Sequence, residues 1–119
     1  MGYYASASSR LMLNDYGKQH LNEIEDIIDS DSNLEWAFDE IEIYSNDSIV
    51  VTKYQDNYHE DETINFLKVI HPYIRNGEAI EYLGEDGSEW RFMRSDDGWD
   101  DQNPTHIWKT VYTYKVKEV

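Results

Sequence analysis

The chain has 119 residues, and its 25 acidic and 10 basic side chains give a formal net charge of −15 at pH 7. Because it contains no cysteine, disulfides, thiolate catalysis and cysteine-based zinc or iron–sulfur sites are excluded. The negative charge also disfavours direct binding to nucleic acid or to anionic membranes, since both depend on Lys and Arg to neutralise phosphate.

Length and aromatic content predict a single folded domain over residues 1–119. Such a chain can bury one continuous core, for which ten Tyr, four Trp and three Phe supply large side chains. No apolar run approaches the roughly 20 residues of a membrane-spanning helix, and no secretory signal is present, so we expect a cytoplasmic protein. Met1-Gly2 to Ser6 fits a loose myristoylation pattern, but Tyr3-Tyr4 is more typical of a strand.

The first strand and the first helix are predicted from the spacing of apolar residues. Residues 3–13 combine Tyr, Ala and Ser with Leu11-Met12-Leu13, a composition typical of a strand. Asn14-Asp15 is a suitable N-cap for a helix over residues 15–29. Within that helix, apolar side chains recur at helical spacing at Leu21, Ile24 and Ile28.

A hairpin is predicted over residues 38–52, around the turn-like Asn46-Asp47. A two-residue loop would pair Ile43 with Val50. A three-residue loop would instead gather four apolar side chains on one face, Ile41, Ile43, Ile49 and Val51. The second register packs better, but the sequence leaves both open.

The second helix is predicted to begin after His59, with acids in its first turn, and to end at Asn76-Gly77. Its apolar stripe consists of Ile64, Leu67, Ile70 and Ile74. Pro72 lacks a backbone donor, so the last turn should be distorted.

Residues 79–94 give the clearest hairpin signal. Glu85-Asp86-Gly87 fits a three-residue loop in which Gly87 takes the left-handed conformation. The resulting cross-strand pairs are Ile80–Phe92, Tyr82–Trp90 and Glu81–Arg91.

An acidic loop, Ser95 to Pro104, is expected to lead to a last strand at about His106 to Val116. The predicted order is therefore β-α-β-β-α-β-β-β, an α+β fold. Its first six elements match the ferredoxin-like split β-α-β arrangement. We accordingly expect an antiparallel sheet with two helices on one face and the other face open.

A distinctive series of motifs runs from Glu60 to Arg94. It consists of Glu60-Asp61-Glu62, Phe66-Leu67, Ile70-x-Pro72-Tyr73-Ile74, Gly77, Gly84-Glu85-Asp86-Gly87 and Trp90-Arg91-Phe92. This pattern resembles an uncharacterised family of small acidic proteins from bacteria and their phages, many of which begin with Met-Gly-Tyr-Tyr. The resemblance implies a mobile-element setting and brings no activity, catalytic residue or cofactor with it.

Two acidic segments have features of cation sites. Asp29-x-Asp31-x-Asn33, with Glu40 at the last ligand position, has EF-hand spacing, but Leu34 stands where that loop needs Gly. Asp96 to Asp101 has no recognised ligand spacing. Divalent-cation binding is therefore an alternative function, and we expect no metal and no other cofactor.

No motif in the sequence specifies a reaction. Ser6, Ser8 and Ser9 lack the Gly-x-Ser-x-Gly elbow of a nucleophile, and the six scattered glycines form no phosphate-binding loop. The four histidines fall in separate predicted elements. We therefore expect that the protein is not an enzyme.

The distribution of acids carries the functional prediction. From Gln19 to Thr52 there are ten acids and no Lys or Arg. Alternate residues of a strand are about 6.6 Å apart, so acids placed in this way present regularly spaced charge, as a nucleic-acid backbone does. The predicted partner-binding residues are Glu23, Asp26, Asp29, Asp31, Glu35, Asp39, Glu40 and Glu42.

These residues predict a non-enzymatic acidic binding protein whose partner is a basic or nucleic-acid-binding protein. It would be an inhibitor from a phage or other mobile element that mimics nucleic acid and blocks a host nuclease or CRISPR effector. A merely solvated acidic surface is the other explanation of the same charge. A small structural module that forms a homodimer through the open sheet face is a further alternative.

Overall fold

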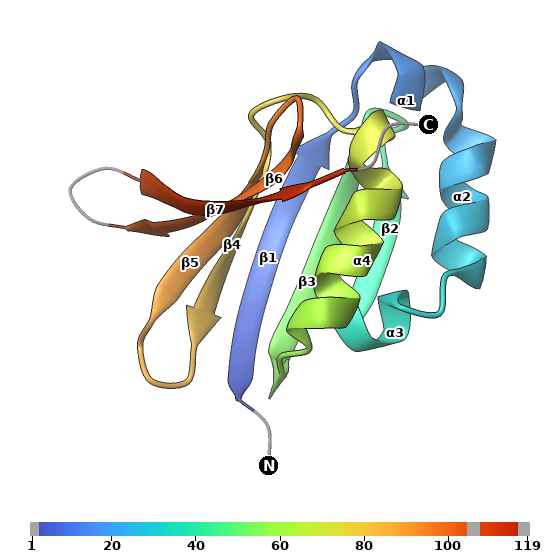
Figure 1. The fold of residues 1–119 in the computed structure, drawn as a ribbon. Helices are drawn as coiled ribbons and strands as arrows, with labels where there is room; N and C mark the ends of the chain where they lie inside the picture. The colour runs from blue at the N-terminus through green and yellow to red at the C-terminus, as the bar shows by residue number, and fades with distance from the viewer. Residues whose placement is uncertain (1–2, 105–107, 117–119) are drawn as a thin grey trace.

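The computed structural model describes residues 3–104 and 108–116 and contains one antiparallel sheet of seven strands (Figure 1). The strands are β1 (Tyr4–Met12), β2 (Glu40–Tyr44), β3 (Ser48–Asn57), β4 (Ala79–Gly84), β5 (Glu89–Arg94), β6 (Gly98–Pro104) and β7 (Trp108–Lys115). Their order is β2-β3-β1-β4-β5-β6-β7, so β2 and β7 are the edges of the sheet. The predicted α+β class and antiparallel sheet are confirmed.

The helical segments lie on one side of this sheet. They are α1 (Asp15–Gln19), α2 (Leu21–Ser30), α3 (Leu34–Ala37), α4 (Glu60–Ile70) and the 3₁₀ turn η1 (His71–Tyr73). Figure 1 shows α4 in front of β3 and β2, and α2 to the right of α4, at the β2 edge of the sheet. None of the helices in the described part of the chain is long and apolar enough to cross a membrane.

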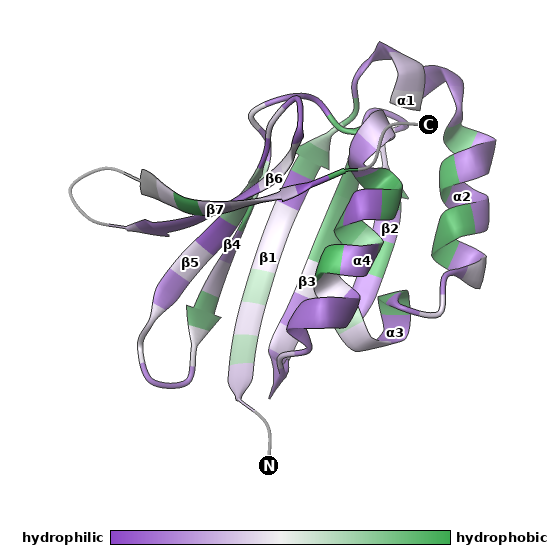
Figure 2. Cartoon of the chain, viewed as in Figure 1, coloured by the Kyte–Doolittle hydropathy of each residue, from purple (hydrophilic) through white to green (hydrophobic). Residues whose placement is uncertain are grey.

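Burial alternates along the strands, as expected when only one face of a sheet is covered. In β1, Ala5, Ala7 and Leu11 are buried against the helices, whereas Ser8 and Arg10 are exposed. Figure 2 shows the matching apolar stripes on α2 and α4. The described residues leave the opposite sheet face uncovered.

The order of the seven strands is not that of a classic ferredoxin-like split, although the four strands of the first six predicted elements lie in the order β2-β3-β1-β4 with antiparallel neighbours. The sheet continues beyond β4 through three hairpin-connected strands. One of them, β6, occupies most of the segment Ser95 to Pro104 that was predicted to be a loop. The reason is Trp99, whose side chain is fully buried and fixes β6 between β5 and β7.

The helix predicted over residues 15–29 is divided into α1 and α2. Asn14 caps α1 as predicted, since its side-chain oxygen accepts a hydrogen bond from the Gly17 amide at 2.7 Å. The chain then leaves helical geometry at His20, where φ is −127° and ψ is 40°. Gly17 lies against η1 so closely that a Cβ there would be 2.3 Å from the Tyr73 carbonyl oxygen.

The β2–β3 hairpin resolves the register that the sequence left open. Ile43 pairs with Ile49 and Ile41 with Val51, which is the three-residue-loop register. Ser45 and Asn46 in the loop have positive φ angles of 54° and 58°. All four apolar side chains therefore face the helices, and the acids between them face the open side of the sheet.

The β4–β5 hairpin has the predicted register, with the pairs Ile80–Phe92, Tyr82–Trp90 and Glu81–Arg91. Gly87 adopts the expected left-handed conformation, with φ of 85°. Its amide donates to the Gly84 carbonyl at 3.0 Å. The Tyr82 and Trp90 rings stack with their centroids 5.2 Å apart.

The second helix begins and ends close to the predicted positions. It starts at Glu60 and changes to 3₁₀ geometry at His71, where Pro72 removes a backbone donor. Gly77, with φ of 90°, follows as the predicted stop. The start of the predicted last strand, residues 106–107, lies outside the described residues, as do Met1 and Gly2 of the myristoylation pattern.

Candidate partner-binding surface

Six of the eight predicted partner-binding acids line one groove of about 630 Å³, between the end of α2, α3 and the edge strand β2. These acids are Asp29, Asp31, Glu35, Asp39, Glu40 and Glu42. The apolar residues of the groove are Ile28, Leu34, Phe38 and Ile41. No Lys or Arg lines it among the described residues, so its polar rim carries charge of one sign only.

Local backbone structure sets the direction of each acid around this groove. Glu40 and Glu42 alternate with Ile41 in β2, so both carboxylates are exposed on the open face of the sheet. Asp39 accepts a hydrogen bond from the Tyr54 amide at 2.6 Å. The Tyr54 hydroxyl in turn donates to Glu40 at 3.0 Å. These contacts join the start of β2 to β3.

Asp31 also has a local structural contact, because its Oδ1 accepts from the Asn33 amide at 2.8 Å in the turn that leads into α3. Asp29 and Glu35 are exposed on either side of that turn. The turn therefore brings the end of α2 and the start of α3 to the same side of the groove.

The other two predicted acids, Glu23 and Asp26, do not line the groove. Both are exposed on α2. A Glu23 carboxylate oxygen lies 3.7 Å from His20 Nε2. The structure therefore divides the predicted set into six groove residues and two residues elsewhere on α2.

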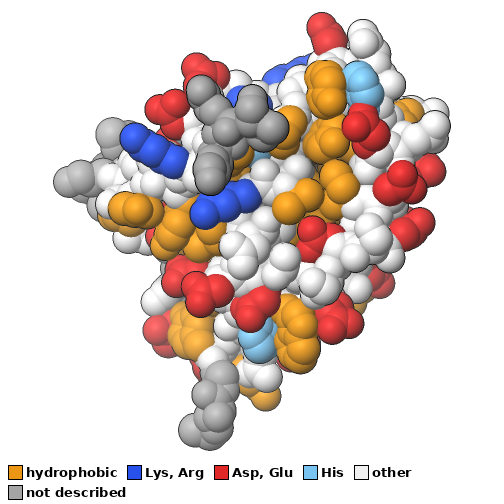
Figure 3. Space-filling model, turned by 45° about the vertical axis from the view of Figure 1, so that its right-hand side comes forward, with side chains coloured by type: hydrophobic (Ala, Val, Ile, Leu, Met, Phe, Trp, Pro, Cys, Tyr) orange, Lys and Arg blue, Asp and Glu red, His pale blue; other side chains and the backbone are white. Residues whose placement is uncertain are grey.

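The charge around the groove is uncompensated by nearby cations. Three ion pairs between described residues, Arg10–Asp47, His20–Glu23 and Arg94–Asp96, include no groove acid. Lys53 of β3 is only 4% exposed and does not line the groove. In Figure 3 the visible Lys and Arg side chains lie in the upper and left parts of the view, with acids beside them, whereas the right-hand and lower parts show acids alone among the charged side chains.

Sequence reasoning missed Trp36, which is half exposed on α3 next to Glu35. Its ring makes an edge contact with His59 at 5.1 Å between centroids, which ties α3 to the start of α4. Exposed Trp side chains are enriched at the energetic centres of protein interfaces. A tryptophan within a long acidic run was the signal that could have identified it.

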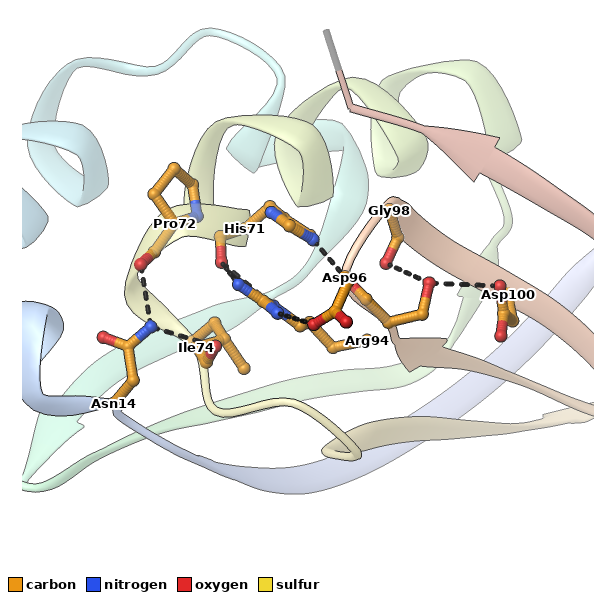
Figure 4. Close-up of polar contacts among 9 residues, drawn as sticks. Asn14, His71, Pro72, Ile74, Arg94, Asp96, Gly98 and Asp100 are labelled. Carbon is orange, nitrogen blue, oxygen red and sulfur yellow. Dashed lines mark hydrogen bonds and ion pairs between the residues drawn. The ribbon is translucent and has the colours of Figure 1, made fainter. Parts of the chain in front are cut away.

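A second polar cluster joins η1 to the β5–β6 turn (Figure 4). The buried His71 ring lies with Nε2 2.8 Å from the Ser95 carbonyl oxygen. The Arg94 guanidinium donates to the His71 carbonyl through Nη2 at 3.1 Å. Asn14 Nδ2 donates to the Pro72 carbonyl at 2.8 Å. These bonds satisfy backbone carbonyls where α4 ends, so we assign this cluster a structural role.

His71 should make stability depend on pH. Burial, aided by nearby Arg94, lowers the pKa of its imidazole from the ordinary value of 6.5. The unfolded chain then binds a proton more readily than the folded chain. Stability is therefore complete above pH 6.5 and declines as the pH falls toward the lowered folded-state pKa.

Urea unfolding midpoints measured between about pH 7.5 and pH 5 test this expectation. The matched variant is H71Q, which keeps a hydrogen-bond donor but does not titrate. Its midpoint should change less with pH than that of the natural chain over the same range. Equal slopes for the two proteins would show that His71 does not contribute.

The two segments considered for cation binding have other contacts. In the Asp96–Asp101 segment, Asp96 lies 4.0 Å from Arg94, and Asp100 accepts from Ser95 and Thr113. In the other segment, α3 interrupts the predicted EF-hand loop. Within residues 3–104 and 108–116, no group of three or more His, Asp or Glu side chains is arranged to hold a metal ion.

Two tyrosines, buried Tyr82 and partly buried Tyr58, have the most strongly shifted pKa values among the described residues. Burial raises the pKa values of Tyr58 and Tyr82 far above the usual range for a phenol. Their rings pack together at 5.4 Å, and both contact Trp90. Because the two phenols stay protonated at neutral pH, neither is poised as a general base.

Comparison with protein-family models, with curated proteins and with solved structures found no match. The resemblance to small bacterial and phage proteins therefore stays a prediction. The fold and site define the molecule as an α+β protein with an acidic groove at one edge of its sheet.

Proposed function

We propose that this protein is a non-enzymatic binding protein whose acidic groove docks a basic surface of another protein. The observation that supports this most directly is that six acidic residues, and no Lys or Arg of the described chain, line one groove. A nucleic-acid-binding enzyme, such as a nuclease or a CRISPR effector, has the matching chemistry, because its own groove is built to receive phosphate.

Physical chemistry favours such docking at two stages. A concentration of one charge sign steers an oppositely charged partner and raises the association rate. Glu40 and Glu42 then present carboxylates roughly 6.6 Å apart along β2, in place of phosphates. Exposed Trp36, next to Glu35 on α3, would supply apolar area, which charge alone does not.

Charge reversal on β2 tests the proposal. The E40K/E42K variant should capture its partners from a bacterial lysate at least about tenfold less well than the natural protein, a loss of about 1.4 kcal/mol. Captured partners should be released both by high salt and by added double-stranded DNA, because DNA competes for the same basic groove.

The matched control is E89K/D97K, which makes the same change in net charge at two exposed acids of β5 and the β5–β6 turn. It should retain capture. The proposal would be rejected if both variants captured the same partners equally well, or if DNA failed to displace them.

A further inference from the structure

One wall of the acidic groove is an unpaired strand edge. β2 comes first in the sheet order and pairs only with β3 among the described strands. A second hollow of about 290 Å³ continues the groove along β2, and the two share Ile28, Asp29, Ile41 and Glu42. Together, the groove and the hollow follow β2 from Glu40 to Ile43, with α2 on their other side.

The two sides of this edge differ in chemistry. On the helix side, Ile41 and Ile43 are only partly buried although they point toward the helices, and Ile28 of α2 is also partly exposed. On the open side of the sheet, Glu40 and Glu42 are exposed. An extended chain laid beside β2 would meet apolar surface with every second side chain and carboxylates with the others.

We infer that the β2 edge binds an extended segment of a partner protein in which apolar residues alternate with Lys or Arg. This inference rests on the proposed function and specifies how the basic partner is held. The segment joins the sheet as an added strand beside β2, between the sheet and α2. Main-chain hydrogen bonds provide binding energy, while the alternation of side chains provides specificity.

The negative charge of β2 favours a basic segment over a second copy of the same chain as the occupant. Two β2 edges placed side by side would bring Glu40 and Glu42 of one copy next to the same acids of the other. Like charges on neighbouring strands are destabilising. Acids on an edge strand therefore protect it against self-pairing and leave it open to a basic strand.

The test uses a short synthetic peptide in which Lys and Val alternate. In a strand, the amides of alternate residues point to opposite sides, so either the Lys or the Val amides face β2. Two further peptides carry N-methyl groups on all Lys amides or on all Val amides. Fluorescence anisotropy should show that one methylated peptide binds at least about tenfold more weakly and that the other binds like the unmethylated peptide.

Two further measurements accompany the titration. Hydrogen exchange of the β2 amides, residues 40–44, should slow when the unmethylated peptide is bound. The E40K/E42K variant should lose binding, whereas E89K/D97K should keep it.

The opposing outcomes separate this inference from the proposed function. If both methylated peptides bind equally, and E40K/E42K still loses lysate partners, then charge docking stands and strand addition is wrong. No binding of the alternating peptide would also overturn strand addition. Light scattering that shows a dimer abolished by E40K/E42K would identify a second copy as the occupant and overturn the basic segment.

Discussion

The W99A variant is expected to lose about 3 to 5 kcal/mol of its free energy of unfolding. Trp99 is 1% exposed and lies in β6, between β5 and β7. Its Nε1 donates to the Leu67 carbonyl of α4 at 2.8 Å, so one side chain fixes the outer half of the sheet to the helix. Alanine would leave a large cavity and an unused carbonyl acceptor in the core.

Urea denaturation followed by far-ultraviolet circular dichroism measures this loss. Domains of this size are stable by only about 5 to 15 kcal/mol, so the change is a large fraction of the total. The matched control is W36A, since Trp36 is half exposed and its replacement should cost much less stability than that of Trp99. Similar losses in the two variants would contradict the assigned role of Trp99.

Hairpins were the part of the fold that sequence reasoning predicted best, because a turn fixes the register of its strands locally. Gly87 takes a positive φ at the end of a three-residue loop, and only that loop keeps the apolar side chains of β4 and β5 on one face. In the β2–β3 hairpin the loop contains no glycine, so both registers remained open. Packing of Ile41 and Ile43 against the helices favours the observed one.

Two features were missed because distant parts of the chain create them. The acids around Trp99 are typical of a loop, and only its burial under α4 makes the segment a strand. The interruption between α1 and α2 accompanies the contact of Gly17 with Tyr73, which is far away in the sequence. Secondary-structure propensity depends on nearby residues and gives no information about either of these distant contacts.

In the candidate site, too, local features could be predicted from the sequence, whereas features that depend on distant parts of the chain could not. Alternation in β2 predicted that Glu40 and Glu42 would share a face, and the structure places both on the open side of the sheet. The groove itself could not be predicted, because it depends on how α2 and α3 sit beside the edge strand. Glu23 and Asp26 were predicted from their charge alone, and their positions on α2 place them outside the groove.

The F38A variant is expected to cost about 3 to 5 kcal/mol and to loosen the groove at the same time. Phe38 is 3% exposed, follows α3 directly and makes an edge contact with Phe66 of α4 at 6.0 Å between ring centroids. It also lines the groove, so one side chain connects the core to the proposed binding surface. Hydrogen exchange at residues 34–38 should accelerate more than exchange at the centre of α4, since local opening needs less free energy than global unfolding.

The F38L variant is the control, because leucine refills much of the space and should recover part of the lost stability. At a temperature where F38A remains folded, its binding to basic partners should still be weaker than that of F38L, since the walls of the groove no longer hold their positions. Uniform acceleration of exchange throughout F38A would show that Phe38 stabilises the whole domain without specifically ordering the groove. Equal partner binding by F38A and F38L would show that the groove does not depend on this anchor.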